Sequence, residues 1–434
     1  MFKGKARLVM FGLLALLLVA LPLLAACGDD DEDKTPGEEE KWITIGGTFH
    51  LTGPTASSTG PTLPFLQNMI RYMNEVEGGI DGIKIKLVWA DDKYDPVTAK
   101  IAYQRMRDQH HPILWAPPTA DVVWIPVRDL FERDMTPVLA TSAYVRELFD
   151  PPSMFFAFRN SDANIFTGLA RWVLQDWEAS GGTGRPKLAH LHWDMPYGNA
   201  SRDGGGYEWA EEYGVDIIDR IYPPMALDLR PQLLDLKNKG ADYVYMSGMV
   251  SDATLLIRDA RATGLWDEMK FIIDHATAPY IYLLPVVGED AEGLYQVRME
   301  EPWTAGPEVA KAHRLETEIR EWGGYSASRL DGSHNYSVKQ ILTAVVRQAV
   351  ADVGYENLNG EAMYNALEKL DHIDTLGGYH NVGWGPDNRM GQSGIKIIQY
   401  RKMAPGSEVP PDGIMMETVA VSDWMETTDI FTGE

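Results

Sequence analysis

Cysteine is almost missing from this sequence, since Cys27 is the only one among 434 residues. A single cysteine excludes an intrachain disulfide and a zinc site built from several thiolates. Positive charge is also scarce: 39 lysines and arginines stand against 63 aspartates and glutamates, which gives a formal net charge of −24. A field of that sign repels phosphate backbones, so no nucleic acid is expected as a partner.

Sequence motifs of common enzymes are absent as well. No serine lies in a Gly-x-Ser-x-Gly frame, no His-Glu-x-x-His occurs, and neither a phosphate-binding loop nor the dinucleotide glycine fingerprint is present. His190, His192 and Asp194 point to one face of a predicted strand, but no fourth ligand follows at the spacing of a metal site. These absences are weak evidence against catalysis, and no resident metal or cofactor is predicted.

Long apolar runs are missing except at the N-terminus. There, basic residues precede an uncharged apolar run over residues 8–24, which is short for a membrane span and typical of an export signal. Residues 1–26 are predicted to be a signal peptide. Residues 27–41 carry two acidic runs and cannot form a core, so they are predicted to be a solvated tether.

What the sequence does contain is a regular alternation of short apolar runs and helical patterns from Trp42 onward. A chain of this length with 45% hydrophobic residues can bury a core and is expected to divide into two domains. The alternation breaks near residues 158–160 and starts again, which predicts an α/β fold with two parallel sheets covered by helices. The predicted strands are 42–48, 83–90, 113–116, 137–140, 188–193, 215–221, 242–246 and 271–273, with a final apolar run at 395–400. The predicted helices are 64–76, 96–107, 122–133, 201–213, 231–239, 253–263, 307–322 and 337–353.

The five residues Leu24-Ala25-Ala26-Cys27-Gly28 resemble the lipobox of bacterial lipoproteins. In such proteins the cysteine is lipidated and becomes the first residue of the mature chain. The resemblance implies an exported protein that is anchored to a membrane surface through Cys27, on a periplasmic or an extracellular face, without a spanning helix. The alternative is an uncleaved segment with an unmodified thiol.

Four short motifs in the first fifty residues of the α/β region together resemble a known family. They are Ile45-Gly46-Gly47-Thr48, Leu51-Thr52-Gly53-Pro54, Gly78-Gly79-Ile80-Asp81-Gly82 and Asp91-Asp92. Their order and spacing are similar to those of type I periplasmic binding proteins of the branched-chain amino acid class, and the likeness extends to about Tyr400. It implies two doubly wound parallel-sheet lobes joined by a three-crossover hinge. The implied lobes are 42–159 plus 297–375 and 160–296 plus 376–434.

The function that this resemblance implies is capture of a small polar solute between two lobes and its delivery to the permease subunits of an ABC importer. The resemblance also implies that the protein is not an enzyme. A branched-chain or other hydrophobic amino acid is the expected ligand, and a monomer is expected. Binding of an amide or an aromatic carboxylate is an alternative. Ligand sensing for a receptor is another, and a hydrolase built on the same scaffold is the third.

The resemblance also implies which residues contact the ligand. In the first lobe these are Ser57, Ser58, Thr119, Ala120, Ser142, Ala143, Tyr144 and Tyr336. Hydroxyl and backbone N–H groups at helix starts favour an anion such as a carboxylate, although the same residues also serve as helix caps. In the second lobe they are Tyr197, Met249, Asp274 and His275. A tyrosine offers a flat apolar face and a hydroxyl, and a thioether suits an apolar ligand group.

Asp274 and His275 leave the identity of the ligand open. Amino-acid binders of this class carry an acid here that pairs with the ligand's ammonium group, and by register that position falls on His275, with Asp274 one residue before it. If Asp274 has taken over the pairing, an amino acid fits. If the imidazole contacts the ligand instead, an amide, a carboxylate or an aromatic acid fits. A purely structural role, in which Asp274 caps the following segment, is the third alternative.

Overall fold

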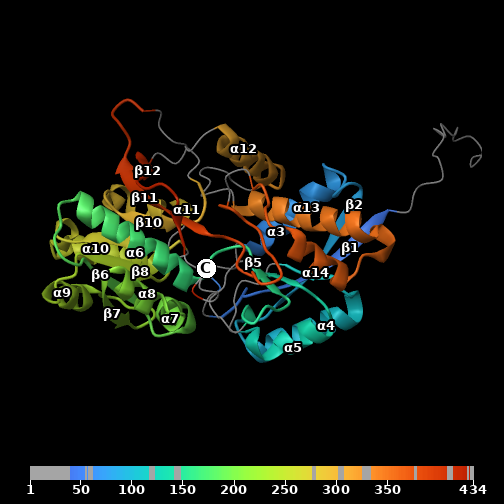
Figure 1. Cartoon of the computed structure of the whole chain (residues 1–434). Coiled ribbons are helices and arrows are strands. Elements are labelled where there is room, and N and C mark those ends of the chain that lie inside the picture. Colours follow the sequence, from blue (N-terminus) through green and yellow to red (C-terminus); the bar gives the residue numbers. More distant parts are fainter. Residues whose placement is uncertain are drawn as a thin grey trace, which may run out of the picture. The chain divides into compact units, whose positions relative to one another are not determined.

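The computed structural model describes residues 40–53, 56, 62–116, 123–140, 148–275, 280–301, 307–324, 334–375, 379–407, 414–427 and 430 (Figure 1). Cys27 and the rest of residues 1–39 lie outside this part, so the export signal and the lipidation site stay predictions. A search of the described residues found no helix with the length and apolar character that a membrane crossing requires.

The first sheet has five strands within the described residues, in the order β2-β1-β3-β4-β5. Its strands are β1 (Lys41–Phe49), β2 (Ile83–Asp91), β3 (Leu114–Trp115), β4 (Val138–Ala140) and β5 (Phe155–Ala157). The pairs β1–β3, β3–β4 and β4–β5 are parallel, as predicted. Gly46 of the first motif is required by packing, because a Cβ there would lie 2.4 Å from the Trp115 ring. The strand β5 was not predicted.

Helices α3 (Thr62–Glu75), α4 (Pro96–His110) and α5 (Arg128–Arg133) belong to this first part of the chain. The helix predicted at 122–133 is shorter than expected, since a 3₁₀ turn over Ile125–Val127 precedes α5. Helix α4 begins where the sequence places a capping signal: Asp95 Oδ2 accepts hydrogen bonds from Thr98 N at 2.7 Å and from Thr98 Oγ1 at 2.6 Å. Pro96 stands at its first position, as is common in helices.

The second sheet has eight strands in the described part, in the order β12-β11-β10-β9-β8-β6-β7, with β13 also paired to β11. Its strands are β6 (Lys187–Trp193), β7 (Asp216–Tyr222), β8 (Tyr243–Ser247), β9 (Lys270–Ile273), β10 (Tyr295–Arg298), β11 (Gly394–Lys402), β12 (Met416–Ala420) and β13 (Met425–Glu426). The strands β6 to β9 pair in parallel, which confirms the prediction for this part. The strand β10, which was not predicted, adds to β9 in parallel. The strand β11 is antiparallel to β10, β12 and β13, an extension that was not predicted.

Helices of the second series are α6 (Asp162–Ala179), α7 (Pro196–Asp203), α8 (Gly206–Tyr213), α9 (Arg230–Asn238), α10 (Val250–Ala262) and α11 (Tyr280–Val287). The single helix predicted at 201–213 is wrong. Gly205 adopts φ +91, a left-handed conformation that glycine tolerates and that cannot continue an α-helix, so the chain forms α7 and α8 instead.

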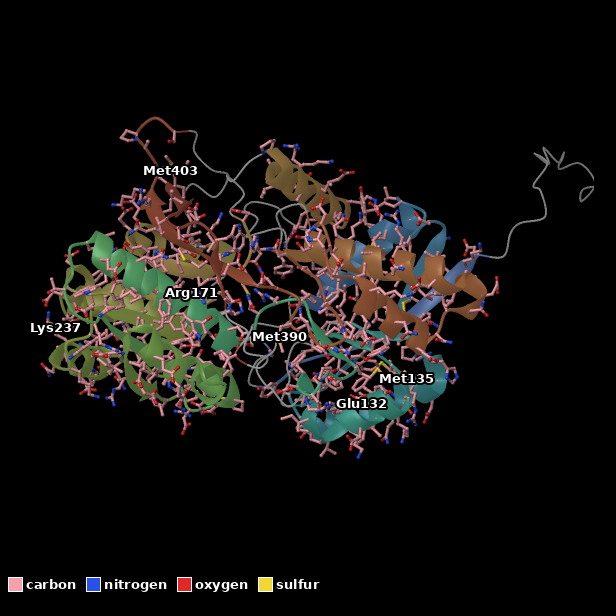
Figure 2. All side chains as sticks on the ribbon, in the orientation of Figure 1. Glu132, Met135, Arg171, Lys237, Met390 and Met403 are labelled. Atoms are coloured by element: carbon pink, nitrogen blue, oxygen red, sulfur yellow. The ribbon has the colours of Figure 1, made fainter. Side chains whose placement is uncertain are left out.

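Three stretches of chain connect the two sheets. The chain leaves the first sheet after β5, returns after β10 to form α12 (Pro307–Trp322), α13 (His334–Val353) and α14 (Gly360–Lys369), and re-enters the second sheet at β11. Both α12 and α13 contact α3, and α14 contacts α13, so these helices belong with the first sheet. The last connection also touches the first sheet, since Met390, labelled in Figure 2, forms a parallel bridge with Ala157. The fold is thus α/β with two lobes, as predicted.

Candidate functional site

The side chains predicted to contact the ligand from the first lobe lie outside the part of the chain that the structure describes. Ser57, Ser58, Thr119, Ala120, Ser142, Ala143 and Tyr144 lie outside the described residues. Tyr336 belongs to α13, but its side chain lies outside the described part. These residues stay predictions, and the second lobe carries the observable site.

In the second lobe, the predicted residues follow three neighbouring parallel strands. Tyr197 follows β6, Met249 follows β8, and Asp274 and His275 follow β9. Because carboxyl ends of parallel strands meet at one edge of a sheet, these residues converge. The Tyr197 hydroxyl donates a 2.8 Å hydrogen bond to Asp274 Oδ2 and lies 3.4 Å from the carbonyl oxygen of Gly248. The structure therefore brings Tyr197, Asp274 and His275 together.

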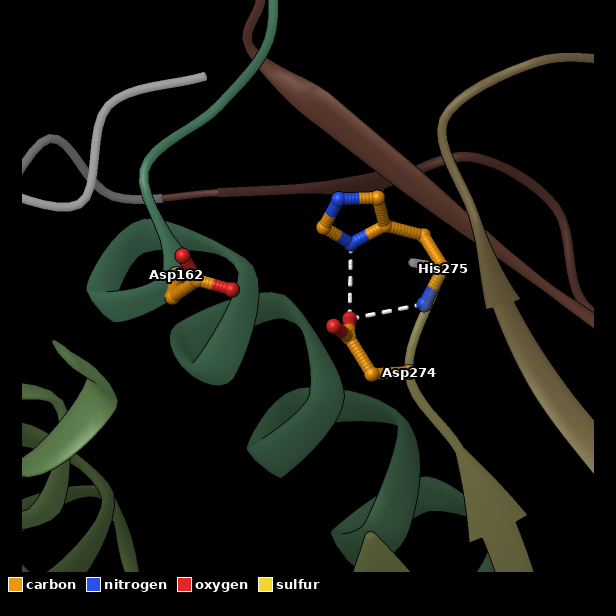
Figure 3. Close-up of side chains that lie close together, drawn as sticks. All are labelled: Asp162, Asp274 and His275. Carbon is orange, nitrogen blue, oxygen red and sulfur yellow. Dashed lines mark hydrogen bonds and ion pairs between the residues drawn. The ribbon is translucent and has the colours of Figure 1, made fainter. Parts of the chain in front are cut away.

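The Asp274 carboxylate is fully buried and is the centre of this cluster. Its Oδ1 accepts three hydrogen bonds: from the Tyr245 hydroxyl at 2.9 Å, from the backbone N–H of His275 at 2.7 Å and from His275 Nδ1 at 2.6 Å. The last two are drawn in Figure 3. With Tyr197 on Oδ2, four donors surround the carboxylate. Asp274 is thus enclosed by groups of its own chain.

These contacts decide the charge of Asp274. Burial alone would raise the pKa of this carboxyl, but the His275 imidazole and the hydrogen bonds from His275, Tyr197 and Tyr245 outweigh it and hold the pKa below its usual range. Burial and the neighbouring Asp274 charge raise the pKa of Tyr245 well above its ordinary value, so this phenol stays a donor. Asp274 is therefore ionised at neutral pH.

The imidazole of His275 is oriented by this carboxylate. Since Nδ1 faces Asp274 Oδ1, we assign the ring proton to Nδ1. The other nitrogen, Nε2, is buried and has no hydrogen-bond partner within the described residues. Nε2 accepts a hydrogen bond when the ring is neutral and donates one when it is charged. Asp274 thus orients the His275 ring, and Nε2 is left without a hydrogen-bond partner among the described residues.

A second carboxylate, that of Asp162, lies beside this pair (Figure 3). Asp162 is the first residue of α6, is buried, and offers an oxygen within 4.8 Å of ligand atoms from Asp274 and His275. The three side chains are of the types that bind divalent metals. However, a metal held by both Asp274 and Nδ1 would have to displace the proton between them, so the observed arrangement is a hydrogen-bonded pair. Two carboxyl groups beside one imidazole favour a ligand group that is positive or donates hydrogen bonds.

Met249 precedes helix α10, and its backbone N–H donates to Asp252 Oδ2 at 2.7 Å. Burial raises the pKa of Asp252 to about 6. The preceding residue must be glycine, because a Cβ on Gly248 would lie 2.3 Å from the Tyr222 hydroxyl oxygen. The loop that carries Met249 is therefore fixed at both ends.

His190 and His192 support the site and do not form a metal centre in the described structure. The two ring nitrogens of His190 contact the hydroxyls of Tyr207 at 2.8 Å and Ser247 at 2.9 Å. Burial and the neighbouring His192 lower the pKa of His190 well below its ordinary value, so the ring is neutral. It stacks on Tyr245 with ring centres 5.2 Å apart, and Tyr245 in turn holds Asp274.

Comparison with known proteins places most of the α/β region in one family. A family model described as "Periplasmic binding protein" matches residues 42–403, which is most of the chain. A comparison with curated proteins found no match.

Solved structures agree with this assignment of the fold. A branched-chain amino acid ABC transporter protein from Thermus thermophilus with bound valine is similar at 18% identity and a TM-score of 0.71, covering 90% of this chain and 98% of that one. A fatty acid ABC transporter substrate-binding protein from Thermomonospora curvata is similar at 20% identity and a TM-score of 0.67, covering 92% of this chain and 96% of that one. A leucine binding protein from Thermotoga maritima is similar at 15% identity and a TM-score of 0.66, covering 88% of this chain and 98% of that one.

Proposed function

The chain belongs to the periplasmic binding protein family, and from this premise we propose that it is the solute-binding component of an ABC importer. It holds a small ligand between its two lobes and passes it unchanged to permease subunits. The location of such a protein is extracytoplasmic. The predicted lipobox supports attachment to the membrane through lipidated Cys27, and the acidic stretch that follows serves as the tether.

The ligand that we propose is a branched-chain or other hydrophobic amino acid. The observation that carries this proposal is the cluster of Asp162, Asp274 and His275, whose ligand atoms lie within 4.8 Å of one another. Its two carboxyl groups beside one imidazole favour an ammonium group over a carboxylate. Met249 and the ring of Tyr197 lie at the same sheet edge and suit an apolar side chain. A fatty acid, which a similar structure binds by its printed name, has no ammonium group and fits this cluster less well.

Binding is proposed to proceed by closure of the lobes about the three connections between the sheets. The proposed lobes are 42–159 plus 297–375 and 160–296 plus 376–434. Loops of the first lobe that carry Thr119 and Ser142 would then meet the ligand's carboxylate. The protein acts as a monomer, and it does not transform its ligand.

Calorimetric titration tests this proposal. Leucine, isoleucine, valine and phenylalanine are titrated alongside two sets of matched controls, the same amino acids as primary amides and the deaminated acids. We expect one of the amino acids to bind with a Kd below about 0.1 mM, a binding free energy of about −5.5 kcal/mol, and the deaminated acids not to bind. Binding of deaminated acids with equal or greater affinity would refute the ammonium assignment. The absence of binding by every compound would refute the solute-binding role for this ligand class.

A further inference from the structure

The C-terminal segment 414–427 follows the strand β11 along its whole length. After β12, the backbone N–H of Val421 donates to the carbonyl oxygen of Ile397 at 2.9 Å, and the Ile397 N–H donates to Ser422 Oγ at 2.9 Å. The strand β13 then pairs with the first residues of β11, and Thr427 N–H donates to the carbonyl oxygen of Ser393 at 2.8 Å. Backbone hydrogen bonds therefore fix residues 421–427, which we name the strap.

Side chains of the strap contact all three connections between the lobes. The first connection lies between β5 and α6, and there Thr427 Oγ1 donates to Asn160 Oδ1 at 3.2 Å. The second follows β10, and there Trp424 Nε1 donates to Glu301 Oε1 at 2.8 Å. The third precedes β11, and there the Trp424 ring stacks on His380, with ring centres 4.2 Å apart and planes 13° apart.

Charge strengthens the contact of Trp424 with the second connection. The Glu301 carboxylate also accepts hydrogen bonds from Lys396 Nζ at 2.7 and 2.8 Å. The same ammonium group lies 5.0 Å from the centre of the Trp424 ring, within the range of a cation–π interaction. Hydrogen bonds to charged groups contribute more than those between neutral groups. Trp424 is therefore held by the second connection, by the third connection and by β11 at once.

We propose that the strap limits rotation of the lobes about their connections and so sets the balance between lobe arrangements before ligand binds. Hinges move when a few connecting residues change their backbone angles, and one side chain that joins two connections ties those changes together. The strap lies beyond residues 42–403, the part matched by the family model, so the family likeness does not assign this role. The proposal rests on the proposed function only in requiring that the lobes move relative to each other.

Distance measurement by electron spin resonance on the ligand-free protein tests this role. Spin labels are placed at Gln109 on α4 and Asn238 on α9, both exposed, in the full chain carrying Cys27→Ser. For Trp424→Ala and Thr427→Val, we expect a broader distance distribution, in which the ratio of the two lobe arrangements changes about tenfold for Trp424→Ala. The conservative Trp424→Phe, which keeps a ring to stack on His380 but loses the N–H donor, should change it less.

The matched control is Trp322→Ala on α12. Trp322 is also partly exposed and packs edge-on against Tyr72, with ring centres 5.6 Å apart, away from the connections. We expect this control to leave the distance distribution as in the wild type. An unchanged distribution in Thr427→Val and Trp424→Phe, with circular dichroism and the unfolding midpoint preserved, would overturn the role of the strap even if Trp424→Ala did not fold.

Failure of the strap and failure of the proposed function are distinguishable, because the distances are measured without ligand. A changed distribution in a protein that binds no amino acid supports the strap and refutes the solute-binding role for this ligand class. An unchanged distribution in a protein that binds its amino acid removes the strap and leaves the solute role in place.

Discussion

Replacing Asp274 with Asn tests the physical argument about the site most directly. The substitution keeps the shape of the side chain but removes its charge. Three of the four hydrogen bonds to Asp274 converge on Oδ1, and all four become bonds to a neutral group or are lost. Hydrogen bonds to charged groups contribute about 1.5–3 kcal/mol each and neutral ones about 1 kcal/mol. Since these bonds share one acceptor and offset its burial, we expect a net loss of about 2–4 kcal/mol in the free energy of unfolding at pH 7.

The dependence of this loss on pH follows from the sign of the pKa shift. Asp274 has a pKa below its usual range in the folded protein, so its contribution is present above the pKa of an unfolded aspartate, about 3.9, and is lost as the pH falls below that value. Urea unfolding at pH 7 and at successively lower pH should therefore show a difference between wild type and Asp274→Asn that shrinks below about pH 4.

The matched control for Asp274→Asn is Asp194→Asn, at an exposed aspartate that follows β6. This control should change the free energy of unfolding by less than about 0.5 kcal/mol. Equal stability of Asp274→Asn and wild type at pH 7 would refute the reasoning, as would a loss that stays constant to pH 3. In calorimetry, the same substitution should weaken the binding of an amino acid more than tenfold. It should weaken the binding of the deaminated amide, which has no ammonium group, much less.

Three further predictions concern the surroundings of the site. Gly248→Ala should lower the free energy of unfolding by about 1–3 kcal/mol in urea titrations, because its methyl group meets the Tyr222 hydroxyl, whereas Gly385→Ala, with open space around it, should not. Asp252→Asn should stabilise the protein at pH 7 by up to about 3 kcal/mol, because a folded pKa raised to about 6 makes the wild type lose stability as the pH rises from about 4 to about 6. The gain should vanish below pH 4, and its persistence there would contradict the assignment. The neutral His190 predicts that the unfolding midpoint of the wild type falls as the pH drops below about 6.5, and His190→Gln should flatten that slope.

Much of the fold could be predicted from the sequence, because strands buried on both faces are continuous apolar runs and the edge strand β2 alternates apolar residues with polar ones. The predicted strand 83–90 is observed as Ile83–Asp91 and the predicted helix 307–322 as Pro307–Trp322. The helix α6 was missed for a physical reason: its residues from Asp162 to Ala170 are all buried, so the alternation of polar and apolar faces that signals a helix is absent. Only the cap on Ser161, which accepts from Asn164 N at 3.0 Å, marks its start.

Residues of this cluster that follow strands could be named from the sequence. Residues that reach the cluster only through the packing of distant elements were missed. Tyr197, Asp274 and His275 could be named from the family resemblance, and each follows a strand of a parallel sheet, where strand ends converge. Asp162 comes from a helix start that is distant in sequence, and Tyr245 points inward from the middle of β8, so no spacing rule connects either residue to Asp274. The pairing of Asp274 with His275 likewise depends on side-chain orientation, which the sequence does not reveal.

The two nitrogens of His275 have different surroundings, and this difference has a consequence for selectivity. One nitrogen is locked onto Asp274, so the ring cannot turn to suit an arriving molecule. The other nitrogen points in one fixed direction and has no hydrogen-bond partner within the described residues. A molecule that meets this ring would have to bring its own polar atom to that position, so the place of the polar group on the molecule counts as much as its chemical type.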